Sequence, residues 1–180
     1  MLHETTSLAL LWYVLLRRGQ SWVDLGFGWE KHDIARSIVL QLGGWAAFTA
    51  VYHALYSSGL TAVGPGKASA LVEHYLFGGG IFGTTFLFQF LNPFFEELIV
   101  RAYVMTEIRF LTNSLPKAIM VSTLLQTSYH FYQGAPVAIA HGATFLLWSV
   151  YYAKTNRIGP VILAHLYADV GGTLWYALRQ

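Results

Sequence analysis

The sequence predicts an all-α fold: a polytopic transmembrane helical bundle of about six spanning helices, with an N-terminal partial or interfacial segment. The 180 residues are 55% hydrophobic and only 11% charged, and the apolar residues form long runs separated by short polar joints. The chain also has 6 tryptophans and 11 tyrosines, whose amphipathic rings collect at membrane interfaces. We therefore expect residues 1–180 to form a single integral-membrane domain.

The N-terminal part begins with a short apolar run. Ser7–Leu16 has about half of the ~20 residues that a spanning helix needs, so we expect a partial first helix. Ser21–Asp33 mixes tryptophan, phenylalanine and charged residues, which is typical of a segment lying at the membrane surface. Ile34–Tyr56 is long enough to span the membrane, and its adjacent glycines, Gly43 and Gly44, allow close helix approach.

Turn residues divide the rest of the chain. Ser57–Ser69 is rich in glycine and predicts a loop. Asn92–Pro93 is a helix start signal, because asparagine caps helix N-termini and proline suits the first helical position. We therefore expect separate helices on the two sides of this pair. The expected spans after the loop are Ala70–Leu91, Pro93 to about Leu111, Lys117–Tyr132, Val137–Ala153 and Ile158 to about Leu178.

Basic residues form three groups, which the positive-inside rule would place together in the cytoplasm. The groups are Arg17, Arg18, Lys31 and Arg36; Arg109 and Lys117; and Lys154 and Arg157. Three predicted helices separate the first group from the second, and an odd number of crossings puts them on opposite sides. Either one helix between them does not cross fully, or the rule does not hold here; of the two, we expect the region around Pro93 to be re-entrant or half-buried.

Composition also excludes several functions. The formal net charge of +2 is small and scattered, so no nucleic-acid partner is expected. The chain has no cysteine, which excludes disulfides, thiolate metal sites and a cysteine nucleophile. No serine stands in a GxSxG context. An activated water is therefore the natural nucleophile for a hydrolytic site.

Six ionisable residues lie within the predicted apolar helices, where each costs at least a few kcal/mol and therefore suggests a functional site. They are Glu96, Glu97, Arg101, His130, His165 and Asp169. Glu97 and Arg101 are four residues apart, as are His165 and Asp169, so each pair shares a helix face. With a rise of ~1.5 Å per residue, the three helices carry these groups to compatible depths. A structural role is the alternative for each pair taken alone, but together the residues predict one site.

These residues also resemble the motifs of a known family. Glu96–Arg101 reads as EExxxR, His130 closes a second motif, and His165–Asp169 reads as HxxxD. Their order and spacing over about residues 92–171 resemble the CPBP family of intramembrane proteases, which includes the type II CAAX prenyl endopeptidases and Abi-like bacterial relatives. The chain departs from the family pattern at three positions. These are Gln126, where an aromatic is usual; Asp169, where Asn is most frequent; and Ala102, where glycine is common.

The resemblance implies a membrane-embedded CAAX-type endopeptidase that hydrolyses a peptide bond without a covalent intermediate. A buried carboxylate is a suitable general base, and an imidazole can stabilise an oxyanion. The expected roles are general base for Glu96, water positioning for His130, support of Glu97 by Arg101, and oxyanion stabilisation by His165 with Asp169. Glu96 and Glu97 can exchange roles.

Several alternatives stay open. No metal is favoured, but a divalent metal such as zinc would use Glu96, His130 and His165 and leave one position for water. The second hypothesis is a non-catalytic protein of the same fold, either a membrane scaffold or a bacteriocin-immunity-type interaction protein. The third hypothesis is a proton-coupled transporter. The expected partners are the lipid bilayer and a peptide or protein substrate, prenylated or not. The expected location is an integral, multi-pass position in a membrane, the cell membrane if the source is bacterial or archaeal.

Overall fold

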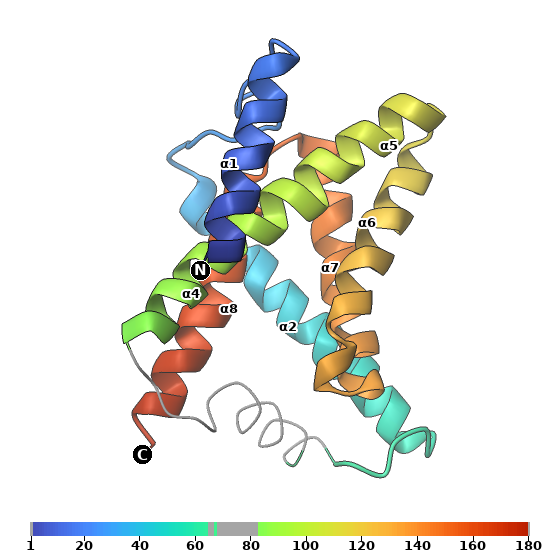
Figure 1. Ribbon diagram of the computed structural model, residues 1–180. Coiled ribbons are helices and arrows are strands. Elements are labelled where there is room, and N and C mark those ends of the chain that lie inside the picture. The colour runs from blue at the N-terminus through green and yellow to red at the C-terminus, as the bar shows by residue number, and fades with distance from the viewer. Residues whose placement is uncertain (1, 65–66, 68–82, 180) are drawn as a thin grey trace.

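A computed structural model describes residues 2–64, 67 and 83–179, and every regular element in these residues is a helix (Figure 1). The predicted all-α class is therefore confirmed. The elements are α1 (Leu2–Arg17), α2 (Asp33–Ser57), α4 (Gly83–Phe95), the π-helix η1 (Glu96–Tyr103), α5 (Val104–Thr112), α6 (Leu115–Tyr129), the 3-10 turn η2 (Phe131–Gln133), α7 (Ala135–Thr155) and α8 (Gly159–Ala177). Of the predicted helix Ala70–Leu91, residues 70–82 lie outside the described residues.

α4, η1 and α5 follow one another without a break and form one helical rod from Gly83 to Thr112 (Figure 1). Pro93 lies inside α4, so the predicted helix start at Asn92–Pro93 is wrong, and the chain does not turn back there. Proline lacks an N–H and crowds the carbonyl four residues earlier, which normally kinks or ends a helix. Here the helix continues, and three residues later its pattern changes to that of a π-helix.

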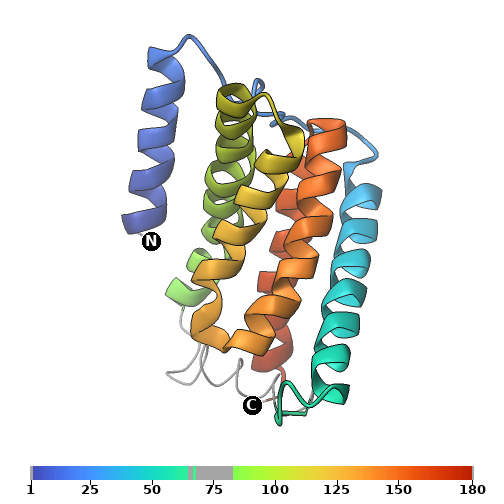
Figure 2. The same cartoon turned by 90° about the vertical axis from the view of Figure 1, so that its right-hand side faces the viewer.

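The helices alternate in direction, which brings most of the basic residues to one end of the bundle (Figure 2). α1, the rod and α7 run toward this end, whereas α2, α6 and α8 start from it. Eight of the 11 lysines and arginines belong to it: Arg17, Arg18, Lys31, Arg36, Arg109, Lys117, Lys154 and Arg157. The first two groups therefore lie at the same end, which removes the conflict between the positive-inside rule and the predicted crossings. The expected re-entrant turn at Pro93 is wrong, because Pro93 lies inside α4 and the break predicted there added a crossing.

α1 is longer than the predicted run Ser7–Leu16 and has 16 residues. Two of its leucines, Leu11 and Leu15, are buried in the main apolar core. The segment from residue 18 to residue 32 then forms a series of turns that cross the basic end. Its Gly26 has a φ of +75°, and the carbonyl of Gly26 accepts a 3.1 Å hydrogen bond from the N–H of Ile158. This bond ties the segment to the start of α8.

α7 packs against both α2 and α6, and a row of its polar side chains bonds to α2 and to the turns before α2. Three of its residues, spaced one turn apart, donate hydrogen bonds to main-chain carbonyls outside α7. The pairs are Thr144 with Gly44 at 2.8 Å, Trp148 with Leu40 at 3.0 Å, and Tyr152 with Leu25 at 3.2 Å. Each of these three polar side chains thus has an acceptor, which offsets the cost of burying it.

α2 is long and apolar enough to cross a membrane, with a mean hydropathy of 1.3 over its best window. Only 17% of that window is buried inside the protein, and Val39, Leu42 and Trp45 are exposed on its outer face. The structure thus bears out Ile34–Tyr56 as a candidate spanning helix. Taken one at a time, the other described helices do not meet the same criteria of length and composition.

Gly44 should be far less tolerant of a larger side chain than its neighbour Gly43. A Cβ at residue 44 would lie 2.8 Å from Thr144 Cγ2 and 3.1 Å from Trp148 Nε1, whereas a Cβ at residue 43 would lie 3.5 Å from Leu147 Cδ1. We expect Gly44→Ala to lower the midpoint of thermal unfolding of the purified protein by roughly 2–8 °C. The control Gly43→Ala should leave the midpoint unchanged or raise it, because alanine favours a helix. Equal midpoints for the two variants would contradict this account of the α2–α7 contact.

Candidate functional site

The π-helix η1 carries three of the six candidate residues. Glu96, Glu97 and Arg101 all lie on it, and all three are buried. The N–H of Val104 donates to the carbonyl of Ile99, five residues earlier, as in a π-helix. Such segments inside α-helices occur frequently at functional sites, since the wider turn changes the direction of the side chains.

Arg101 lies at the centre of the buried polar residues and is completely buried. Its guanidinium forms an ion pair with Glu97 and a hydrogen bond to the side-chain oxygen of Gln126 on α6. On α7, it donates to Ser149 Oγ at 3.3 Å and lies 5.6 Å from the ring centre of Trp148. Arg101 therefore contacts three elements, and this network offsets part of the desolvation cost of its charge.

Glu97 lies between Arg101 and His165, so both of its oxygens have partners. Its Oε2 faces the guanidinium, and its Oε1 lies 2.8 Å from His165 Nδ1 on α8. The other ring nitrogen, His165 Nε2, lies 3.6 Å from Asp169 Oδ1, which is longer than a hydrogen bond. The structure thus brings Glu97, Arg101, His165 and Asp169 together, but the closest contact of His165 is with Glu97.

Glu96 has a different environment, because both of its hydrogen bonds come from uncharged donors. Asn92 Nδ2 donates to Oε1 at 3.1 Å, and the hydroxyl of Tyr129 donates to Oε2 at 2.8 Å. The same Asn92 amide lies 3.4 Å from Asp169 Oδ2, so it connects α4 and α8 beside Glu96. Unlike Glu97, Glu96 has no cation bonded directly to it among the described residues. The Glu96 carboxylate therefore has no direct ion pair that competes with a proton, and it is better suited than the Glu97 carboxylate to accept one.

His130 ends α6 and points its ring into a group of aromatic side chains. Its Nδ1 lies 2.8 Å from the main-chain oxygen of Gln126, so Nδ1–H donates there and Nε2 is left for another partner. Its ring centre lies 4.8 Å from that of Phe145 and 5.3 Å from that of His141 on α7. Gln126 thus holds Arg101 through its side chain and His130 through its main chain.

Four contacts of the site were not predicted from the sequence: Asn92, Gln126, Tyr129 and His141. Asn92 was interpreted as a helix cap, although on an unbroken helix its spacing of four residues from Glu96 would have suggested a contact. Gln126 was noted only as a departure from the family pattern. No local pattern in the sequence distinguishes Tyr129 or His141 as part of a site.

The described residues do not form the alternative metal site of Glu96, His130 and His165. No group of three or more histidine, aspartate or glutamate side chains among the described residues is placed to hold a metal ion. Of the three residues of that site, His165 points its two nitrogens toward Glu97 and Asp169, and His130 points Nδ1 toward a carbonyl.

Comparison with known proteins gives one match. The family model described as type II CAAX prenyl endopeptidase Rce1-like matches residues 78–171, which contain all six candidate residues. No match was found among curated proteins or among solved structures.

Removing Arg101 alone should destabilise the protein more than removing both charges of the pair. Arg101→Met leaves Glu97 buried without its main partner, which should cost about 3–5 kcal/mol in the free energy of unfolding. The double variant Glu97→Gln with Arg101→Met should regain a measurable part of that loss, because no uncompensated carboxylate remains. Chemical unfolding in detergent would measure both. A double variant as unstable as the sum of the two single variants would show that the charges do not depend on each other.

Proposed function

Because the chain belongs to the type II CAAX prenyl endopeptidase Rce1-like family, we propose that it is an intramembrane endopeptidase in which Glu96 activates a water molecule. The observation that carries this proposal is the difference between the two adjacent carboxylates. Glu97 is bonded to Arg101 and His165, whereas Glu96 is held only by the neutral groups of Asn92 and Tyr129. Glu97 therefore supports the site, and Glu96 is the general base.

The proposed reaction needs one proton acceptor, one oriented water and one oxyanion donor. Glu96 takes a proton from the water while the water oxygen attacks the carbonyl carbon of the peptide, with His130 Nε2 orienting it. As the imidazolium, His165 donates Nδ1–H to Glu97 and presents Nε2–H to the developing oxyanion. The proton on Glu96 then passes to the leaving nitrogen, the peptide bond breaks, and an amine and a carboxylic acid are released; the second proton of the water stays on the acid, which ionises in solution.

We propose further that the whole chain, residues 1–180, is one multi-pass membrane domain. The family is membrane-associated, and α2 has the length and composition of a spanning helix. Two features support further crossings: the alternating direction of the helices, and the gathering of eight of 11 basic residues at one end. By the positive-inside rule that end lies in the cytoplasm. The substrate is a peptide or protein segment, prenylated or not, that reaches the site within the membrane.

The test is hydrolysis of prenylated and unprenylated peptides by the purified protein in detergent. Glu96→Gln keeps the size of the side chain but removes the base, so the rate should fall by about 10²–10⁴-fold. Tyr129→Phe should have a smaller effect, because it removes one of the two hydrogen bonds to Glu96. A chelator should leave the rate unchanged, since the proposed steps use side chains alone.

Two matched substitutions control for general damage. Glu107→Gln alters a glutamate near the other end of the same rod, and His53→Gln alters an exposed histidine of α2; both should retain full activity. Full activity of folded Glu96→Gln would exclude Glu96 as the base. If no peptide is cleaved and the Glu96 and His130 variants keep the biological phenotype, the protein is a non-catalytic membrane partner with the same fold.

A further inference from the structure

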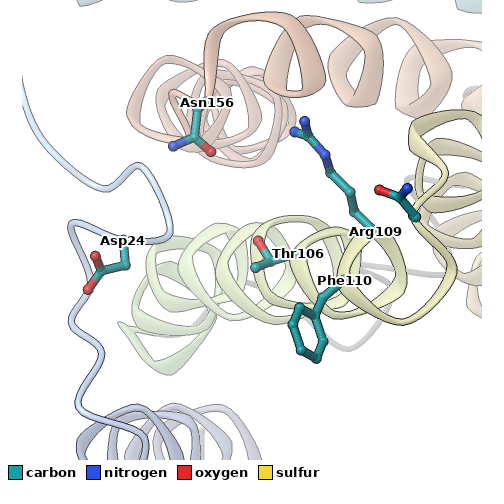
Figure 3. A pocket seen from close by; sticks show the side chains of 6 residues that line it. Asp24, Thr106, Arg109, Phe110 and Asn156 are labelled. Atoms are coloured by element: carbon teal, nitrogen blue, oxygen red, sulfur yellow. The ribbon is translucent and has the colours of Figure 1, made fainter.

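A hollow at the basic end of the bundle lies apart from the candidate site. Its volume is about 370 Å³, and it is lined by Asp24, Thr106, Arg109, Phe110, Asn113 and Asn156 (Figure 3). These residues come from the turns after α1, from α5 and the residue that follows it, and from the residue that follows α7. Because helices end here, the hollow lies at the level where a spanning bundle meets lipid headgroups.

The hollow offers hydrogen-bond donors that the protein does not use. Three other arginines of this end are bonded to carboxylates: Arg18, Arg36 and Arg157. In the described part of the chain, by contrast, Arg109 has no ion-pair or hydrogen-bond partner. The side-chain amides of Asn113 and Asn156, which follow the ends of α5 and α7, have none either. A guanidinium with nearby amides is a donor set that suits phosphate oxygens.

Asp24, the carboxylate in the lining, points away from the hollow and opposes an anion only through its distant charge. Figure 3 shows its carboxylate turned away from Arg109. Its Oδ2 accepts hydrogen bonds from the N–H of Ser21 at 2.6 Å and from the hydroxyl of Ser21 at 2.9 Å. These two bonds hold the pKa of Asp24 below its ordinary value. The Asp24 carboxylate therefore stabilises the turn in which it lies. No carboxylate of the lining is aimed into the hollow to bind an ammonium group.

The surroundings of the hollow are apolar, which points to a lipid rather than a free anion. Phe110 is 83% exposed, and the neighbouring Leu111 is 71% exposed. Val23, beside Asp24 in the turns, is 73% exposed. A soluble phosphate gains nothing from such side chains, whereas acyl chains attached to a phosphate would cover them.

We propose that this hollow binds the phosphate headgroup of an anionic phospholipid, with Arg109 as its principal contact and the acyl chains along Phe110 and Leu111. The proposal rests on the membrane placement described above but not on the hydrolytic chemistry. Zwitterionic lipids fit less well, because no carboxylate of the lining is aimed into the hollow to pair with their cationic group. The bound lipid would hold α5 and α7 together where both helices end.

Native mass spectrometry and thermal unfolding of the purified protein in detergent can test this with phosphatidylglycerol, phosphatidylcholine of the same acyl chains, and inorganic phosphate. Phosphatidylglycerol should bind and stabilise best. Arg109→Gln should weaken its binding by about tenfold, because a charge-assisted hydrogen bond is lost. Asp24→Asn, which keeps an oxygen for Ser21, should strengthen binding, since it removes a nearby negative charge. Lys154→Gln, at the same end but outside the lining, is the control and should have little effect.

Each other outcome overturns the proposal. Equal binding of phosphatidylglycerol and phosphatidylcholine would exclude an anionic headgroup, and equal stabilisation by inorganic phosphate would exclude a lipid. Weaker phosphatidylglycerol binding in Asp24→Asn would show that this carboxylate itself holds the headgroup, contrary to the proposed donor set. An Arg109→Gln variant that binds lipid like Lys154→Gln would show only a diffuse attraction to the basic end. Hydrolysis by these variants is measured in parallel, so failure of the lipid site and failure of the proposed enzyme are seen separately.

Discussion

The buried charge of Arg101 is the constraint on which the arrangement of the helices depends. A guanidinium without water needs several acceptors, and this one finds them on its own helix and on two others: Glu97, Gln126 and Ser149. Meeting that need brings η1, α6 and α7 together. It also fixes Glu97, whose second oxygen reaches His165 on α8. The candidate site is thus assembled around a cation that has no direct role in the proposed reaction.

This arrangement explains why two adjacent glutamates can have different tasks. Glu97 points into the network and has charged or ionisable partners on both oxygens, whereas Glu96 points toward Asn92 and Tyr129. The two residues have the same chemistry and nearly the same position in the chain. Their difference comes from the direction in which η1 turns each side chain and from what the neighbouring helices place there.

Much of this could be predicted from the sequence, and the failures have physical reasons. Helical periodicity and apolar runs identify the helices, and spacings of four residues identify Glu97 with Arg101 and His165 with Asp169 as neighbours. The unbroken rod could not be predicted, because Pro93 is a strong local stop signal that tertiary packing overrides. The role of Gln126 depends on a contact between residues 25 apart in the chain, which no local pattern contains.

The π-helix determines what a change of length would do at the candidate site. A stretch of π-helix holds more residues per turn than an α-helix, so it behaves as an insertion absorbed within a helix. Loss of one residue from Glu96–Tyr103 would therefore be taken up by a return to regular α-helix, and α4 and α5 would keep their faces toward the same neighbours. The side chains between them would change direction, so Glu96, Glu97 and Arg101 would no longer meet their partners on α4, α6, α7 and α8. A deletion here would remove the candidate site and leave the bundle around it intact.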